Sequence, residues 1–318
     1  MQDDAPTLEA ALKRFPDHLR AELEQIAGNG GMLCANMVHH LCNEMDSDIE
    51  QLMLQLVPLA ASYGTAPVSG YFVGAVARGQ RQDANGYPQL YLGANLEFPH
   101  QALCYSLHAE QAAVANAWHH REPGIASVAV SAPPCGHCRQ FLYELCGSTP
   151  LGIIFPDSTR QNYREMDIAE LLPGAFGPMD LGHTGNMMAA NSHPVSLQIE
   201  SAEALTLNAL EAARFSYAPY TNDHAGCALQ LQDGSIFSGS YAENAAHNPA
   251  LSPLHAALSN MRMALGPDIF SNLAQTLARC VLVESDGNIS QRELATTLLS
   301  SIAPEIALEY YPARAANE

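Results

Sequence analysis

An internal repeat restricts this 318-residue chain to a small set of architectures. Three patterns recur in the same order: residues 67–75 match 219–227, Gly93-x-x-x-Glu97 matches Gly239-x-x-x-Glu243, and His108-Ala109 matches His255-Ala256. Because the order of the patterns is kept, the two stretches are expected to share one fold. The length also suits about two domains.

The first copy has the pattern of an α/β domain. We predict helices at 7–27, at 49–63, after His108 and after Cys138, and strands at 71–76, 89–92, 125–130 and 152–155. Asn85-Gly86 lies in the hairpin connection between the first two strands. We divide the chain into an N-terminal helical segment (1–48), a first domain (49–173), a linker rich in Gly, Met, Ala, Asn and Pro (174–191) and a second domain (192–318).

One histidine and two cysteines of the first copy have the spacing of a zinc site. His108 begins one predicted helix, and Cys135 and Cys138 begin the next within Pro134-Cys-Gly-His-Cys138. A catalytic zinc takes three protein ligands and keeps one position open. A helix N-terminus also stabilises the thiolate form that binds zinc. We therefore predict that these three residues hold one Zn²⁺ per chain.

Glu110 follows His108 by two residues, so its carboxylate can reach a water on the metal without binding the metal itself. A carboxylate placed there can act as general base and then as general acid. Alone, the Cys-x-x-Cys pair would fit a redox pair or a structural zinc half-site equally well. The second copy has Ala257 in place of the glutamate and no Cys-x-x-Cys, so we expect a degenerate domain with a packing role.

Composition excludes several classes of function. The net charge is −19, from 14 basic and 33 acidic residues, which disfavours a nucleic acid polymer as partner. No apolar run approaches the ~20 residues of a membrane span, and the acidic N-terminus is unlike a secretory signal. We expect a cytoplasmic protein that does not bind membranes. The remaining cysteines are expected to be buried small hydrophobic residues: Cys34, Cys42, Cys104, Cys146, Cys227 and Cys280.

Taken together, these residues resemble the cytidine deaminase family in its bacterial two-domain form. His-x-Glu followed by Pro-Cys-x-x-Cys is the signature of zinc deaminases, in which the glutamate is not a ligand. Val73-Gly74-Ala75 and Gly93-x-Asn95-x-Glu97 also match the family's segments in order. The resemblance implies an α/β/α sandwich around a mixed sheet in each domain. It also implies an active unit of four such cores, which this chain would reach as a homodimer.

The resemblance further implies which residues contact the substrate. Asn95 and Glu97 would bind the ribose hydroxyls, Tyr71 would pack on the pyrimidine, and a backbone N–H of Ala109 or Glu110 would meet the base carbonyl. Tyr71 stands where the family usually has phenylalanine, which leaves stacking possible. Asn95 could instead cap a loop, and Tyr71 could belong to ordinary core packing.

The expected activity is zinc-dependent hydrolysis of cytidine and 2′-deoxycytidine to uridine and 2′-deoxyuridine, as in pyrimidine salvage, with Glu110 as proton carrier. One alternative is a deaminase of the nucleotide dCMP, for whose phosphate Arg78 and Arg81 are the candidates. Another is a zinc-binding scaffold without activity, against which the intact Glu110 argues.

Overall fold

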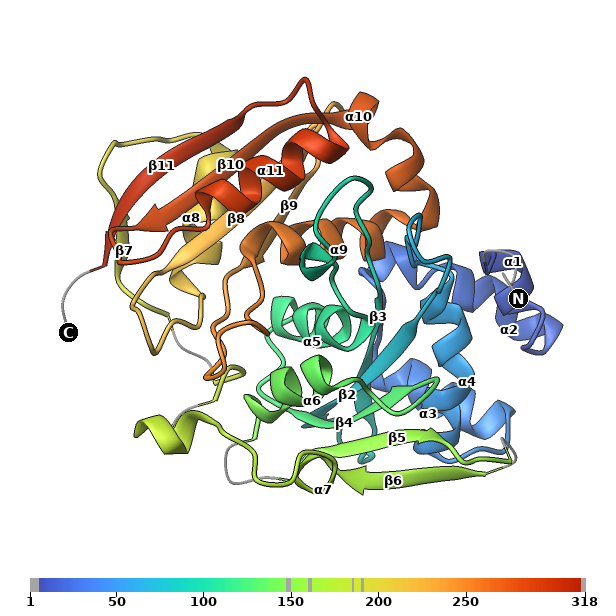
Figure 1. The fold of residues 1–318 in the computed structure, drawn as a ribbon. Helices are drawn as coiled ribbons and strands as arrows, with labels where there is room; N and C mark the ends of the chain where they lie inside the picture. Colours follow the sequence, from blue (N-terminus) through green and yellow to red (C-terminus); the bar gives the residue numbers. More distant parts are fainter. Residues whose placement is uncertain (1–5, 147–149, 160–161, 185, 190–191, 316–318) are drawn as a thin grey trace.

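A computed structural model describes residues 6–146, 150–159, 162–184, 186–189 and 192–315. It contains two sheets, each with helices on both faces, and N-terminal helices beside the first sheet (Figure 1). The expected pair of tandem α/β domains is therefore confirmed. The predicted division includes residues 1–5, 185, 190–191 and 316–318, which lie outside the described residues, and its exact boundaries stay a prediction.

The first sheet has six strands, which are, in order across the sheet, β1 (Met32–Leu33), β3 (Pro88–Ala94), β2 (Gly74–Gln82), β4 (Ile125–Val130), β5 (Gly152–Pro156) and β6 (Tyr163–Asp167). Only β4 and β5 run parallel; the other neighbours are antiparallel. Parallel neighbours need a crossover connection, and the helix between β4 and β5 provides it. The sheet is therefore mixed, as expected.

Helices cover both faces of this sheet. They are α1 (Leu8–Leu12), α2 (Asp17–Glu24), α3 (Ala35–Glu44), α4 (Ile49–Ala61), α5 (Ala109–His119), α6 (Gly136–Tyr143) and α7 (Ile168–Leu171), with short 3₁₀ turns η1 (Ala27–Asn29), η2 (Leu103–Tyr105) and η3 (Pro178–Leu181). Alternation along the strands separates the faces: Val76 and Leu92 belong to the core under α4, whereas Ala75 and Tyr91 belong to the core around α5.

The second sheet repeats this arrangement. Its strands are, in order, β7 (Val195–Leu197), β11 (Leu308–Ala315), β10 (Leu277–Ser285), β8 (Ala225–Leu231) and β9 (Ile236–Ser240), and its helices are α8 (Ala204–Arg214), α9 (Pro253–Leu265), α10 (Leu273–Thr276) and α11 (Arg292–Ile302), with η4 (Pro267–Asn272). The order β9-β8-β10-β11 corresponds to β3-β2-β4-β5, and again only one pair, β10 and β11, is parallel. The helices α8, α9 and α11 correspond to α4, α5 and α6.

Gly93 and its counterpart Gly239 are required for the same steric reason in the two copies. A Cβ on Gly93 would lie 2.0 Å from the backbone nitrogen of Ala113 in α5, and a Cβ on Gly239 would lie 2.2 Å from that of Ala257 in α9. Both distances are far below van der Waals contact, so only glycine lets the helix approach its strand this closely. The repeat in sequence thus preserves a helix–sheet contact.

The two domains pack through α5 and α9, which lie side by side between the two sheets (Figure 1). The largest hydrophobic cluster runs through this interface and takes buried residues from both copies, among them Val114 and Trp118 of α5 and Leu258 and Met261 of α9. A shared core of this kind means that neither domain buries its apolar surface alone.

The structure differs from the sequence predictions in several places. The predicted match of His255-Ala256 to His108-Ala109, with Ala257 in place of the glutamate, was wrong in register: Ser252 precedes α9 as His108 precedes α5, so His255 corresponds to Gln111 and Leu254 to Glu110. The strand expected at 71–76 begins at Gly74, because the side chain of Asn95, not a neighbouring strand, holds the backbone of Tyr71. The N-terminal segment is mostly helical but also supplies β1 to the sheet edge. Cys34 and Cys104 are exposed, so the expectation that all six remaining cysteines are buried was wrong for these two.

Candidate active site

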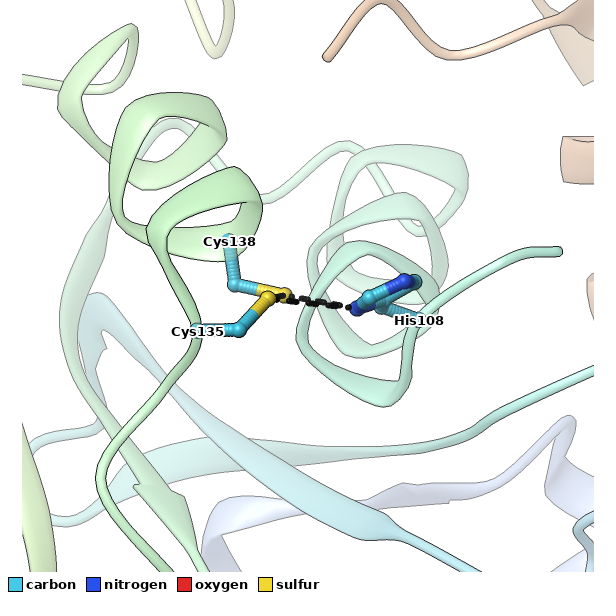
Figure 2. Close-up of side chains that lie close together, drawn as sticks. All are labelled: His108, Cys135 and Cys138. Carbon is cyan, nitrogen blue, oxygen red and sulfur yellow. Dashed lines mark hydrogen bonds between the residues drawn. The ribbon is translucent and has the colours of Figure 1, made fainter. Parts of the chain in front are cut away.

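Two helix N-termini bring the predicted zinc ligands together. His108 is the residue immediately before α5, and Cys135 is the residue immediately before α6, with Cys138 in the first turn of that helix. In Figure 2 both sulfurs point toward the ring of His108. The three residues therefore meet because α5 and α6 pack on the same face of the sheet and begin at the same end.

The distances between the donor atoms fit a tetrahedral zinc. His108 Nδ1 lies 3.2 Å from Cys138 Sγ and 3.5 Å from Cys135 Sγ, and the two sulfurs are 3.6 Å apart. Zinc bonds of ~2.3 Å to sulfur and ~2.0 Å to nitrogen, at tetrahedral angles, separate two sulfurs by roughly 3.8 Å and a sulfur and a nitrogen by roughly 3.5 Å. Within the described ranges, this is the one group of three or more such residues that could hold a metal ion.

The two cysteines have unequal electrostatic environments. Hydrogen bonding between their sulfurs lowers the pKa of Cys135 to about 4 and raises the pKa of Cys138 well above its usual value. Burial also raises the pKa of Cys138, which is fully buried, whereas Cys135 is exposed. One thiolate is thus already favoured at neutral pH, and a dication would be needed to favour both. His137 lies outside the ligand group, with its ring centroid 5.0 Å from that of His108.

Glu110 lies in the first turn of α5, beside the donor group, and is 6% exposed. Burial raises its pKa, because an enclosed carboxylate loses the solvation that stabilises its charge. A carboxyl group with a raised pKa can both accept and return a proton near neutral pH. The environment of Glu110 is therefore suited to the proton-carrying role predicted for it.

A cavity of about 330 Å³ lies in front of these groups. Its lining includes His108, Ala109, Glu110 and Cys135 on the metal side, and Tyr71, Asn95 and Glu97 on the other. All four residues predicted to contact substrate thus lie on one cavity with the metal group. Tyr71 remains 64% exposed, so its ring is available to a ligand and is not core packing.

Asn95 and Glu97 also form hydrogen bonds to the backbone segment beside the cavity. The Asn95 side chain donates to Tyr71 O and accepts from Val73 N, each at 2.9 Å. The Glu97 carboxylate accepts from the backbone N–H groups of Val68 and Ser69, at 3.0 and 2.9 Å, and from the Ser69 hydroxyl at 2.5 Å. These contacts fix the segment 68–73 and orient both side chains at the cavity edge.

Sequence reasoning missed several cavity residues: Ser69, Ser106 and the segment Ser131–Pro133. The last of these follows β4 directly and precedes Pro134, so its position beside the motif was a usable signal. The proposed phosphate ligands do not line this cavity. Arg78 Nη1 lies 2.7 Å from a carboxylate oxygen of Glu50, and Arg81 donates to the backbone carbonyl of Arg121.

The fold and the donor set together define a zinc-binding deaminase site, and known proteins agree with this. Family models described as the cytidine and deoxycytidylate deaminase zinc-binding region match residues 46–149 and 168–296. A cytidine deaminase of Aliivibrio fischeri is 38% identical over 306 residues, which cover 95% of this chain and 97% of that protein. One from Aeromonas hydrophila is 42% identical over 264 residues, which cover 83% of each chain. The chain therefore belongs to the cytidine and deoxycytidylate deaminase family.

The matches fall on both copies of the repeat, which confirms that the second domain descends from the same fold. They also confirm the enzyme class and zinc as the metal. Across the residues described, no helix combines the length and apolar character that crossing a bilayer requires.

Proposed function

We propose that this chain hydrolyses cytidine and 2′-deoxycytidine to uridine and 2′-deoxyuridine, as in pyrimidine salvage in the cytoplasm. The observation that carries the proposal is a buried carboxylate, Glu110, beside a His-Cys-Cys group at the end of a nucleoside-sized cavity. The relatives named cytidine deaminase support the same substrate.

His108, Cys135 and Cys138 would hold the metal, and Zn²⁺ bound there would lower the pKa of a water molecule toward ~7. Glu110 accepts the proton of that water and delivers it to N3 of the pyrimidine, while the water oxygen bonds to C4. Glu110 then transfers the second proton to the exocyclic amine, the C4–N bond breaks, and ammonia leaves. The balance is one water consumed and one ammonia released for each nucleoside.

The remaining cavity residues bind and orient the nucleoside. Tyr71 offers an exposed ring to the pyrimidine, and Asn95 and Glu97 stand where the ribose hydroxyls would be bound. The backbone N–H of Ala109 or Glu110, at the N-terminus of α5, can donate to the base carbonyl, since N–H groups in the first helical turn have no partner within the helix. The absorbance lost when cytidine is converted to uridine measures this activity directly, and a zinc-loaded chain that leaves cytidine unchanged would contradict it.

The nucleotide alternative is less well supported. A dCMP deaminase needs cations at the 5′ end of the substrate, and Arg78 and Arg81 are bonded elsewhere. Comparing turnover of cytidine with turnover of dCMP tests this, and we expect the nucleoside to be preferred.

We also propose that the active form is a homodimer. Tyr71, which lines the cavity, is 64% exposed, and two large apolar side chains within three residues of cavity-lining Ser69 and Ser106 are also exposed: Val68 at 53% and Leu103 at 74%. Exposed apolar residues gathered around a site favour burial by a partner, and a second copy would also exclude water from the cavity. Sedimentation of the full chain tests this; a fully active species of 34.1 kDa would contradict the dimer.

A further inference from the structure

His255 is the third residue of α9, the position that Gln111 has in α5. His255-Ala256 matches His108-Ala109 in sequence, but Ser252, not His255, immediately precedes α9 as His108 precedes α5. Among the described residues, the group that could hold a metal ion does not include His255.

The side chain of His255 crosses to the first domain. Its Nε2 lies 2.6 Å from the backbone carbonyl oxygen of Tyr105, and its ring centroid lies 5.6 Å from that of Phe98. A carbonyl oxygen only accepts, so Nε2 must carry the proton and donate it. Burial lowers the pKa of His255 to about 4, so the donor is a neutral imidazole at neutral pH.

The contacted carbonyl belongs to the segment that leads into the first zinc ligand. Tyr105 ends η2, three residues before His108. Between them, Leu107 exchanges backbone hydrogen bonds of 2.9 Å with Leu96 of its own domain. This segment is thus held at Leu107 from within the first domain and at Tyr105 from the second.

A second contact between the domains lies just after His108. The Gln111 side chain accepts from the backbone N–H of His108 at 3.3 Å and donates to the carbonyl of Pro249 at 3.1 Å. The second domain therefore contacts the chain on both sides of His108. The position of this backbone determines the direction in which the His108 ring points.

We propose that His255 is a positioning residue for the zinc site: its hydrogen bond to Tyr105 holds the 105–107 segment so that His108 Nδ1 stays directed at Cys135 and Cys138. The inference rests on the proposed function only for its catalytic readout, because the geometry of the metal site can be measured without substrate. The third position of α9, which corresponds to Gln111 of α5, thus carries a histidine that supports the metal site of the first copy.

Two variants of similar size separate the hydrogen bond from packing. His255→Gln keeps an N–H donor at about the same reach, whereas His255→Met fills a similar volume without a donor. In the Co²⁺-substituted protein, we expect His255→Met to shift the visible absorption bands and His255→Gln to keep them near those of the wild type. Zinc release to a chelator should be roughly tenfold faster in His255→Met. Residues that orient the metal ligands without binding the metal commonly change metal affinity by at least this factor.

Catalysis gives a third readout, in which His255→Met lowers kcat more than it raises KM for cytidine. A matched control is His224→Gln, because His224 is also buried in the second copy but bonds Ser216 and stacks on His193. That variant should lower the melting temperature without changing the cobalt spectrum. If His255→Met does not fold, His255→Asn, whose amide is too short to reach Tyr105, replaces it.

The outcomes distinguish the two proposals. A wild-type spectrum and release rate in His255→Met, or equal shifts in His255→Met and His255→Gln, would overturn the positioning role and leave only packing. A shifted spectrum in His255→Met but not in His255→Gln, in a protein that does not deaminate cytidine, would support the positioning role and refute the proposed substrate.

Discussion

The two copies keep the same scaffold but differ in chemistry, and the comparison separates what folding requires from what the site requires. Glu97 accepts hydrogen bonds from Val68 and Ser69, and its counterpart Glu243 accepts from Tyr220 and Thr221 in the same pattern. Because the described residues of the second copy form no metal group, this contact has a structural role there. Glu97 thus has a folding role in addition to any role toward substrate.

Other matching positions carry different residues in the two copies, because the second copy lacks the catalytic and substrate-binding side chains. Leu254 of α9 stands in the place of Glu110 of α5, and Tyr241, which is buried, stands in the place of Asn95. Metal ligands and the proton carrier therefore vary independently of the helix–sheet packing that surrounds them. Substitutions at matching positions of the two copies should have different consequences, and this can be measured.

The largest difference is expected for cysteine. Cys135→Ala should reduce the zinc content from about one per chain to nearly none and abolish activity, because two protein ligands do not hold zinc tightly. Cys227→Ala in the second copy is the matched control and should keep its zinc. Elemental analysis of the purified proteins checks both, and zinc retained in Cys135→Ala would refute the ligand assignment.

Glu110→Gln should keep zinc and the fold but lose ~10²–10⁴-fold in kcat, since it removes general acid–base catalysis alone. The assay is ultraviolet turnover of cytidine on protein of confirmed zinc content. Turnover near the wild-type value would show that protons travel by another route.

Substitutions of Glu97 and Glu243, which make matching hydrogen bonds in the two copies, should have smaller and more selective effects. Glu97→Ala should reduce kcat/KM for cytidine at least ~10-fold more than for free cytosine, because a site that bonds a hydroxyl discriminates against a ligand lacking it. Glu243→Ala should lower the melting temperature and leave the cytidine-to-cytosine ratio unchanged. Equal losses on both substrates in Glu97→Ala would leave this residue with its structural role only.

The smallest effect concerns Asp223, the counterpart of Tyr71. It is fully buried, and burial, aided by the charge of Glu284, raises its pKa from 3.8 to about 7. The folded state then binds more protons than the unfolded state between these values, so stability falls as pH rises from about 4 to 7. Asp223→Asn removes this dependence.

We therefore expect Asp223→Asn to raise the free energy of unfolding at pH 8 by roughly 1–3 kcal/mol relative to wild type, and by less at pH 5. Denaturant unfolding at the two pH values measures this. A gain that is the same at both would show that the carboxyl group is not the source of the pH dependence.

Local signals allowed much of this molecule to be predicted from sequence. The order of patterns in the repeat predicted two α/β domains, and the spacing of His108, Cys135 and Cys138 predicted a group that the structure brings within bonding range of one metal. Ligands at helix N-termini are predictable because each depends only on its own helix start.

Contacts between distant segments could not be predicted. The bond from His255 to Tyr105 joins residues 150 positions apart and depends on how α9 packs against α5. Glu144, at the end of α6, accepts from the hydroxyls of Tyr217 and Tyr220 of the other domain, and no local pattern marks it. Such pairs depend on tertiary packing, which one sequence does not reveal.

Titration of the metal-free chain with Zn²⁺, followed by cytidine turnover, tests the central claim most directly, namely that one deaminase site exists and lies in the first copy. Activity should rise in proportion to added zinc and reach its maximum at one equivalent per chain. Absence of cytidine turnover at every zinc level, or a maximum reached only at two equivalents, would contradict this account.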